Sequence, residues 1–182
     1  AVHGRKGPVW LDIPLDIQAC MIEETTLRGW KPEEIPEQEK NEKRKRLEQQ
    51  VMETIAQLNQ ARRPVLLAGN GIRLSEGREE FEKLVEILQI PVLTTWNGID
   101  LIEEEHPLFF GRPGGMGQRY ANFVQQNSDF FLSIGARMNL LQTGYNFDGF
   151  ARAAYKVMVD IDENELHKIN VRPQLAIEAD AK

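Results

Sequence analysis

The sequence contains little cysteine or histidine, and this scarcity excludes several kinds of site. Its 182 residues include one cysteine, Cys20, and three histidines, His3, His106 and His167. A single cysteine cannot form an internal disulfide or a cysteine-rich zinc site. We expect Cys20 to be structural or incidental rather than catalytic. The histidines are scattered and lack the short spacing of metal-binding pairs. We therefore predict neither a metal centre nor a histidine-based catalytic site in this chain.

Long apolar runs and an excess of positive charge are also missing. No apolar stretch approaches the length of a membrane span, and no signal peptide opens the chain. The net charge of -6 argues against nucleic acid as a main partner. The basic run at 43–46 is flanked by Glu39, Glu42 and Glu48, and we interpret it as a solvated helix face. These features predict a cytoplasmic protein with no membrane or nucleic-acid partner.

The length suffices for one full core with appendages. Neither end looks like a natural terminus, which suggests a piece of something larger. Residues 8–14, "PVWLDIP", are predicted to form a short strand without an obvious partner. Residues 19–40 are polar, contain Pro32 and Pro36, and are interpreted as a linker, with Trp30 pinning it to a surface.

From residue 41 onward, helical and strand patterns alternate. Leu47, Val51, Ile55 and Leu58 have the spacing of an amphipathic helix. Further helices are predicted at 76–89, with Ser75 as N-cap, at 118–127 and near 163–169. Apolar runs predict strands at 64–68, 90–95, 108–111, 129–135, 155–162 and 175–179. The predicted fold class is α/β: a doubly wound parallel sheet of about six strands flanked by helices, in a Rossmann-like domain of the DHS-like NAD/FAD-binding type.

Glycines and charged residues follow nearly every predicted strand. The segments are "GNG" (69–71), "TTWNG" (94–98), "RPGGMG" (112–117), "GAR" (135–137) and "DID" (160–162). Ligands of such sheets bind at the carboxyl ends of the strands. We expect bare glycine N–H groups there to suit phosphate oxygens, with Arg137 contacting a pyrophosphate and Asp160 a ribose or ribityl hydroxyl. The alternative is that these are ordinary loop glycines and surface charges.

Two familiar nucleotide motifs are incomplete or absent. Leu74 occupies the place of the third glycine of G-x-G-x-x-G, and no acid ends the second strand of the predicted sheet. A P-loop does not occur either. The residues themselves therefore predict a binding domain rather than a self-contained active site.

Several segments, taken in order, resemble one enzyme family. "GRKGPVWLDIPLDIQ" resembles the end of the pyrimidine-binding domain of thiamine diphosphate-dependent enzymes. "RPVLLAGNGI", "IPVLTTWNGID", "HPLFFGRPGGMGQRYAN", "SDFFLSIGAR" and "VDIDENELHK" resemble their central domain. The resemblance covers residues 4–182. Within this family, the chain most resembles the large subunit of acetolactate synthase.

The resemblance implies a division into three parts. Residues 1–18 would end the preceding pyrimidine-binding domain, 19–40 would be a linker, and 41–182 would form the central domain. The activating glutamate and the G-D-G…N motif for Mg²⁺ and diphosphate lie in the other two domains, so this fragment alone would be inactive. The full-length enzyme would be a transferase or lyase that decarboxylates a 2-keto acid and transfers the carbanion equivalent to a second carbonyl. It would form homodimers or homotetramers, and its partners would include the other domains of the same chain.

The resemblance also implies a flavin site, because the central domain of acetolactate synthases binds FAD in a structural role. The family's flavin contacts correspond here to Gly69, Asn70, Gly71, Thr95, Trp96, Gly114, Gly115, Met116, Gly135, Ala136, Arg137, Asp160 and Asp180. Two motifs depart from the family pattern. Met116 stands where G-M-H-G has histidine, and the acids and last arginine of G-A-R-F-D-D-R become Asn139, Leu140 and Leu141.

Other interpretations remain open at the level of sequence. The cleft of this domain could hold FAD, ADP or nothing. The chain could be a nucleotide-free structural domain of another thiamine diphosphate enzyme, such as a 2-keto acid decarboxylase. A remote alternative is a sirtuin-type NAD-dependent deacylase, although the four-cysteine zinc module and the catalytic histidine of that class have no counterpart here.

Overall fold

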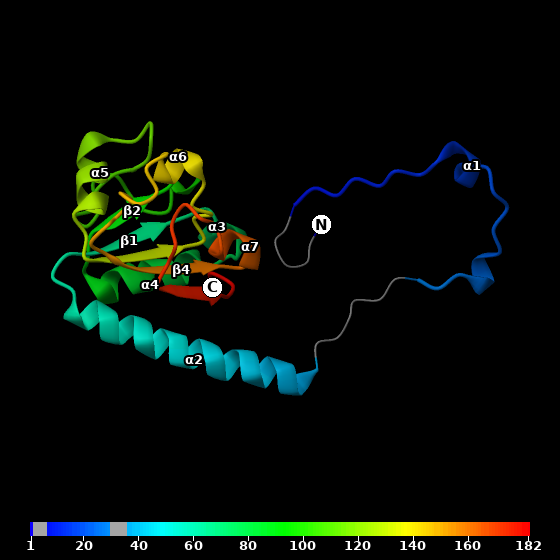
Figure 1. Cartoon of the computed structure of the whole chain (residues 1–182). Coiled ribbons are helices and arrows are strands. Elements are labelled where there is room, and N and C mark those ends of the chain that lie inside the picture. The colour runs from blue at the N-terminus through cyan, green and yellow to red at the C-terminus, as the bar shows by residue number, and fades with distance from the viewer. Residues whose placement is uncertain (2–6, 30–35) are drawn as a thin grey trace. The chain divides into compact units, whose positions relative to one another are not determined.

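A computed structural model describes residues 1, 7–29 and 36–182, and Figure 1 shows the whole chain. Its contacts divide it into two units, Ala1–Lys45 and Arg46–Lys182. The described residues of the first unit include a short helix α1 (Leu15–Gln18), a 3-10 turn η1 (Glu24–Thr26) and the start of α2 (Glu37–Gln60). Trp30, which was predicted to pin the linker to a surface, lies outside the described residues.

The strand predicted at 8–14 is wrong, because residues 7–14 have no regular secondary structure. A strand needs a neighbouring strand to satisfy its N–H and C=O groups, and the described part of this unit offers none. Every described residue from 7 to 29 is exposed. The exposed large apolar side chains of this stretch are Val9, Trp10, Leu11, Ile13, Leu15, Ile17, Met21, Ile22 and Leu27.

The second unit is built on a parallel sheet of five strands. They are β1 (Pro64–Ala68), β2 (Val92–Thr94), β3 (Phe130–Ile134), β4 (Tyr155–Asp160) and β5 (Leu175–Glu178). Their order in the sheet is β2-β1-β3-β4-β5, and every pair is parallel. A parallel sheet must be covered on both faces, which explains why the strands are continuous apolar runs. The α/β fold predicted from the sequence is confirmed.

Helices and loops cover both faces of the sheet. On one face α4 (Arg78–Leu88) packs Phe81 and Val85 against the sheet, and the end of α2 contributes Leu58. On the other face lie α5 (Arg119–Gln126) and α7 (Glu163–Leu166), with the chain that includes α6 (Leu140–Thr143) and Phe150. Figure 1 shows α4 and α5 on opposite sides of the strands. The helix α3 (Gly71–Leu74) and the turn η2 (Trp96–Gly98) follow β1 and β2 directly.

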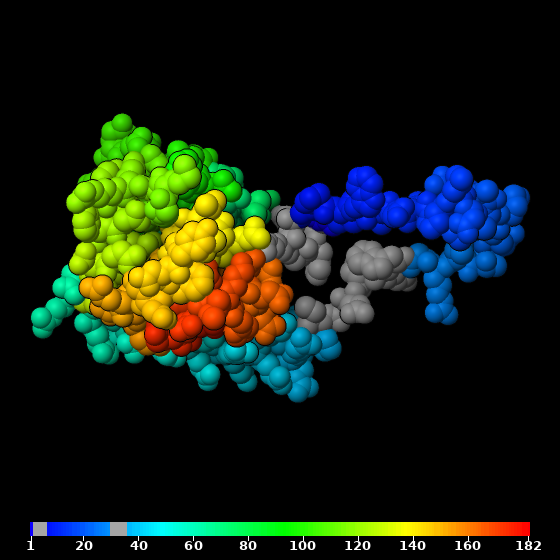
Figure 2. Space-filling model, turned by 45° about the horizontal axis from the view of Figure 1, so that its top comes forward, coloured from blue at the N-terminus to red at the C-terminus, as the bar shows by residue number. Residues whose placement is uncertain are grey.

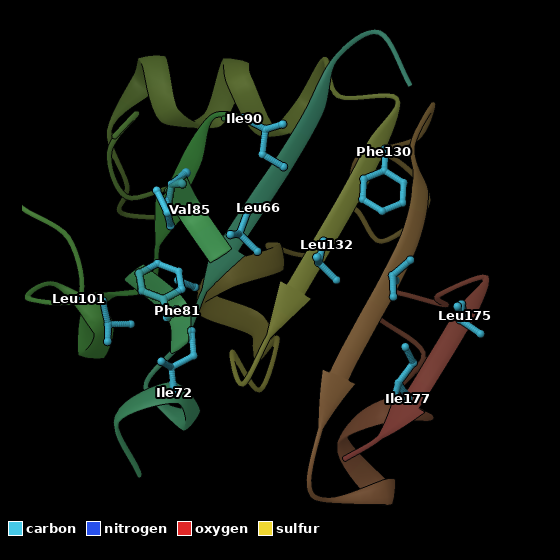
Figure 3. Close-up of a cluster of buried hydrophobic side chains, with 13 residues drawn as sticks. Leu66, Ile72, Phe81, Val85, Ile90, Leu101, Phe130, Leu132, Leu175 and Ile177 are labelled. Atoms are coloured by element: carbon cyan, nitrogen blue, oxygen red, sulfur yellow. The ribbon is translucent and has the colours of Figure 1, made fainter. Parts of the chain in front are cut away.

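The core on the α4 side consists of aliphatic and aromatic side chains from strands and helices. Figure 3 shows Phe81 and Val85 of α4 facing Leu66 of β1. Further along the sheet, Phe130 and Leu132 come from β3. Because all five strands are parallel, their carboxyl ends lie along one edge of the domain.

Three predicted details differ from the structure. Residues 108–111 form no strand, although Phe109 makes an isolated parallel bridge to Val92, so the sheet has five strands instead of about six. Ser75 does not cap α4, since its hydroxyl donates to the Ile72 carbonyl (2.9 Å) and α4 begins after Gly77. The long helix α2 begins at Glu37, inside the predicted linker. The basic run at 43–46 is exposed on α2.

Candidate functional site

The predicted site residues lie mainly along one edge of the sheet, which we call the rim: the segments 69–73, 95–100, 111–117, 135–142 and 160–165. The strand order reverses direction between β1 and β3, because the chain passes from β1 to β2 and then returns to the other side of β1. In open α/β sheets, such a reversal leaves a crevice at the carboxyl ends of the two strands. The loops after β1 and β3 are therefore where a ligand would be sought first.

The glycine turns after β1 and β3 touch each other directly. A Cβ added at Gly69 would lie 2.2 Å from the Cα of Ala136, and one at Gly71 would lie 2.6 Å from the Cα of Gly135. The Gly71 N–H donates to the Gly135 carbonyl at 2.9 Å. The absence of side chains thus serves the contact between two stretches of backbone, at the position where the crevice would open.

The N–H groups of the glycines at 69, 71, 98, 114, 115, 117 and 135 donate hydrogen bonds within the domain, so the expectation that these donors are bare was wrong. Those of Gly69 and Gly135 donate to the carbonyls of Ile134 and Val159, each at 2.9 Å. The N–H of Gly114 donates to Asn122 Oδ1 (2.9 Å) and that of Gly115 to the Leu141 carbonyl (2.7 Å). The acceptors come from neighbouring strands and loops, which no sequence pattern located.

Some backbone donors at the rim remain. Within the part of the chain that the structure describes, no hydrogen bond uses the N–H of Asn70, Ala136 or Arg137. These three amides belong to the two glycine turns that touch. They are among the backbone donors that a ligand at this edge would find unused.

Arg73 joins the loops after β1 and β2, and sequence reasoning did not single it out. Its guanidinium donates to Asn70 Oδ1 and to the Asn97 carbonyl (2.9 Å), and it forms an ion pair with Asp100. The side chain of Asn70 is therefore an acceptor for Arg73. The signal in the sequence was an arginine within one turn of the glycine motif, but its partners Asn97 and Asp100 lie more than twenty residues further on.

Thr95 and Trp96 begin the loop after β2. Thr95 is buried, and its N–H donates to the Ala68 carbonyl at 3.0 Å, which fixes this loop to the end of β1. Trp96 starts η2, and 61% of it is exposed. The preceding residue, Thr94, is fully buried, and its hydroxyl has no hydrogen-bond partner within the described residues.

The loop that contains Gly114, Gly115 and Met116 is attached to the segment after β3. Besides the bond from Gly115 to Leu141, the Gln142 side chain donates to the Pro113 carbonyl at 3.2 Å. A Cβ at Gly114 would lie 2.7 Å from the Leu141 carbonyl oxygen. Met116 is 79% exposed. Figure 2 shows the yellow α6 segment against the yellow-green chain that precedes it.

Arg137 points its charge at a buried carboxylate. Its Nε lies 3.2 Å from Oε1 of Glu165 on α7, and Lys168 pairs with the other oxygen of that carboxylate. Arg137 and Met138 both have positive φ, 58° and 46°, so the backbone is left-handed at two successive non-glycine residues. Such a conformation is costly and persists where the surrounding contacts impose it.

The two late acids are separated. Asp160 ends β4 and is buried, and its Oδ1 accepts the Asp162 N–H at 3.1 Å. Asp180 is exposed, follows β5 and accepts the Lys182 N–H at 2.8 Å. The end of the chain runs toward α4, since a Cβ at Gly77 would lie 3.2 Å from the Cα of Lys182. The structure therefore brings Asp160 into the rim and leaves Asp180 beyond it.

The histidines and acidic residues of the described chain do not gather into a metal-binding cluster. Among residues 1, 7–29 and 36–182, no group of three or more His, Cys, Asp or Glu side chains is placed to hold a metal ion. His106 uses Nδ1 to accept the Leu108 N–H (3.2 Å), and His167 lies 3.7 Å from Glu163 on the surface. No helix in the described part is both long and apolar enough to span a membrane.

Comparison with known proteins gives one family match. The family described as "Thiamine pyrophosphate enzyme, central domain" matches residues 51–182. This stretch includes all five strands and the whole rim.

Several curated proteins that are similar to the chain are named as acetolactate synthases. The chain is 37% identical to the probable acetolactate synthase large subunit of Methanococcus aeolicus, over 100% of the chain and 30% of that protein. It is 34% identical to the acetolactate synthase isozyme 1 large subunit of Escherichia coli K12, over 99% of the chain and 30% of that protein. For the probable acetolactate synthase 2 of Oryza sativa, the identity is 37%, and the shares are 100% and 26%. The chain thus spans less than a third of the length of these relatives.

Proposed function

The chain belongs to the thiamine pyrophosphate enzyme family, whose central domain it contains, and we propose that it is the middle part of an acetolactate synthase-like enzyme. The observation that carries the proposal is the coverage. Large subunits of acetolactate synthase align with essentially all of this chain, yet the chain accounts for only 30% of the Methanococcus protein. A domain of a larger enzyme is expected to match in this way.

We propose that the complete protein decarboxylates a 2-keto acid such as pyruvate and transfers the resulting carbanion equivalent to a second carbonyl. Thiamine diphosphate supplies the electron sink for this chemistry. The described residues of this chain include no cluster that fits the cofactor's Mg²⁺. The cofactor and metal would accordingly be held by the other domains, and the 182-residue chain alone would be inactive.

The role proposed for this chain is to connect and orient those domains. Residues 1–18 are proposed as the end of the pyrimidine-binding domain, 19–40 as a linker and 41–182 as the central domain. The exposed apolar side chains between residues 9 and 27 support the proposal, because isolated chains rarely leave so many of them in water. The other domains of the same polypeptide are their proposed partners, within a homodimer or homotetramer. A location in the cytoplasm is proposed as well.

We propose that the thirteen residues identified above are this chain's counterparts of the flavin contacts in acetolactate synthases. Twelve of them lie in the rim segments, and Asp180 lies beyond them. A second candidate is a nucleotide-free structural domain in another thiamine diphosphate enzyme, such as a 2-keto acid decarboxylase. The direct contact between the loops after β1 and β3 favours this candidate.

Product analysis of the longer protein that contains this chain distinguishes the candidates. The purified protein is incubated with pyruvate, thiamine diphosphate and Mg²⁺, and CO₂ release and organic products are measured. An acetolactate synthase-like enzyme releases CO₂ and forms acetolactate, whereas a simple decarboxylase forms acetaldehyde. A protein that releases no CO₂ from pyruvate or other 2-keto acids would overturn the proposed function.

A further inference from the structure

We infer that the rim of this domain is closed by its own loops and holds neither FAD nor ADP. The inference concerns the cofactor that the fold family implies, and it relies on the proposed function only for the comparison with flavin-binding relatives. Four contacts between neighbouring rim segments carry it. Each uses a group that a nucleotide would otherwise need.

The first contact closes the crevice between β1 and β3. The backbone at Gly69 approaches Ala136 so closely that an added Cβ would lie 2.2 Å from its Cα. The bond from the Gly71 N–H to the Gly135 carbonyl, at 2.9 Å, holds the two loops together. A pyrophosphate cannot lie between two backbones that are hydrogen-bonded to each other.

The second and third contacts pair two arginines of the rim with acidic side chains. The Arg73 guanidinium bridges Asn70, the Asn97 carbonyl and Asp100. The Arg137 guanidinium is directed at the buried carboxylate of Glu165. A diphosphate binds strongly where charged donors meet it. Here the unused amides of Asn70, Ala136 and Arg137 are accompanied by arginines that already have acidic partners.

The fourth contact involves the two altered motifs. Asn139, which stands in place of an acid of the family pattern, caps α6 by accepting the Gln142 N–H. The Leu141 carbonyl then receives the N–H of Gly115 at 2.7 Å. The loop that has Met116 in place of histidine is therefore joined directly to the segment that has lost its charges. No polar side chain at 140 or 141 is left to meet a flavin.

The test measures flavin content and stability in the longer protein that contains this chain. It is incubated with excess FAD and thiamine diphosphate, desalted and denatured, and the released flavin is measured by its absorbance. An acetolactate synthase that purifies with FAD serves as the positive control. We expect no flavin above background here, whereas one FAD per chain would overturn the inference.

Thermal unfolding with FAD or ADP as the added probe gives a second readout. A ligand that binds only the folded state raises the midpoint in proportion to ln(1 + [L]/Kd). We expect an unchanged midpoint with either probe, together with cooperative unfolding that shows the protein was folded. A concentration-dependent rise with either nucleotide contradicts the inference.

Hydrogen exchange measures whether the N–H groups of the rim itself are protected. The N–H groups of Gly69, Gly71, Gly115 and Gly135 are expected to be protected without any nucleotide, and added FAD is expected to leave their protection unchanged. Weak protection that increases with FAD would show an open rim. The proposed function fails separately: a flavin-free protein that releases no CO₂ disproves the enzyme assignment but not the closed rim.

Discussion

At Gly69 and Gly71, the missing side chains allow two loops to share one space. A Cβ at Gly69 would meet backbone atoms of Gly135 and Ala136, which cannot move without displacing β3. At Gly115, by contrast, the nearest atom to an added Cβ would be the Leu141 carbonyl oxygen, at an ordinary 3.6 Å. Gly69 therefore has no room for a side chain, whereas Gly115 does.

The first prediction compares alanine at these two positions. Gly69→Ala is expected to lower the free energy of unfolding by about 3 kcal/mol, because overpacking forces the backbone to shift. Gly115→Ala is the matched control and is expected to change it by less than about 0.5 kcal/mol. Urea unfolding of both variants measures the difference. Equal stability of the two variants would contradict the close contact between the loops.

The second prediction concerns Tyr155 at the start of β4. Its hydroxyl lies 2.7 Å from Glu53 Oε1 on α2. Burial, followed by the hydrogen bond and the charge of Glu53, raises the pKa of Tyr155 to about 12. Because the pKa is higher in the folded state, the stabilisation is present below the unfolded value of about 10 and is lost as pH rises toward about 12.

Ultraviolet absorbance of the phenolate follows this titration. Glu53→Gln is expected to lower the pKa of Tyr155 partway toward its ordinary value, since burial of the ring remains. A pKa that does not respond to Glu53→Gln would show that the contact between α2 and β4 is not formed in solution.

The sequence predicted which residues lie at the rim where those residues form a motif, but it did not predict which residues they contact. The glycines after β1 and β3 were predicted to meet a ligand, and the contact between their two backbones was not foreseen. That they face each other depends on strands separated by more than sixty residues, which no local pattern encodes. Arg73 and Glu165 were missed for the same reason, because each acts on a loop that is distant in sequence.

At the scale of elements, Asp129 joins the start of β3 to the connection between α2 and β1. Its carboxylate accepts the N–H groups of Arg62 (2.9 Å) and Arg63 (2.8 Å). Burial raises the pKa of Asp129, but these two N–H groups and the Arg63 charge outweigh it, so the pKa lies below its ordinary value. The stabilisation is therefore present above the unfolded pKa and is lost as pH falls through the folded pKa.

The third prediction follows from this pairing. Asp129→Asn is expected to lower the free energy of unfolding by about 1 kcal/mol at neutral pH, since one charge-assisted bond is weakened and one acceptor is lost. The difference from the parent chain is expected to vanish in acid. Urea unfolding at a series of pH values measures it. Asp148→Asn, at an exposed pair with Arg172, is the control and is expected to have little effect.

Helices with strong periodicity and strands with continuous apolar runs were predicted well. Segments that lack a neighbouring strand were wrongly predicted as strands. The strands predicted at 64–68 and 155–162 have largely apolar sequences, and the structure forms β1 at Pro64–Ala68 and β4 at Tyr155–Asp160. The segment at 8–14 is equally apolar but has no partner strand among the described residues of its unit. The strand predicted at 108–111 does not form, and only Phe109 makes a single bridge to Val92.

At the scale of the whole molecule, the chain divides its residues between a compact α/β unit and a first unit whose described residues are exposed. The compact unit has its own core on both faces of the sheet. Among the described residues, no group of His, Cys, Asp or Glu side chains is placed to hold a metal ion. The family match over residues 51–182 assigns the compact unit to the central domain of thiamine pyrophosphate enzymes.

The most direct test of this account compares thiamine diphosphate binding by the 182-residue chain and by the longer protein that contains it. Calorimetric titration is carried out in the presence of Mg²⁺, and CO₂ release from pyruvate is measured on the same samples. We predict that only the longer protein binds the cofactor and releases CO₂. Saturable binding of thiamine diphosphate by the 182-residue chain, or no binding by the longer protein, would contradict the assignment of this chain as a non-catalytic central domain.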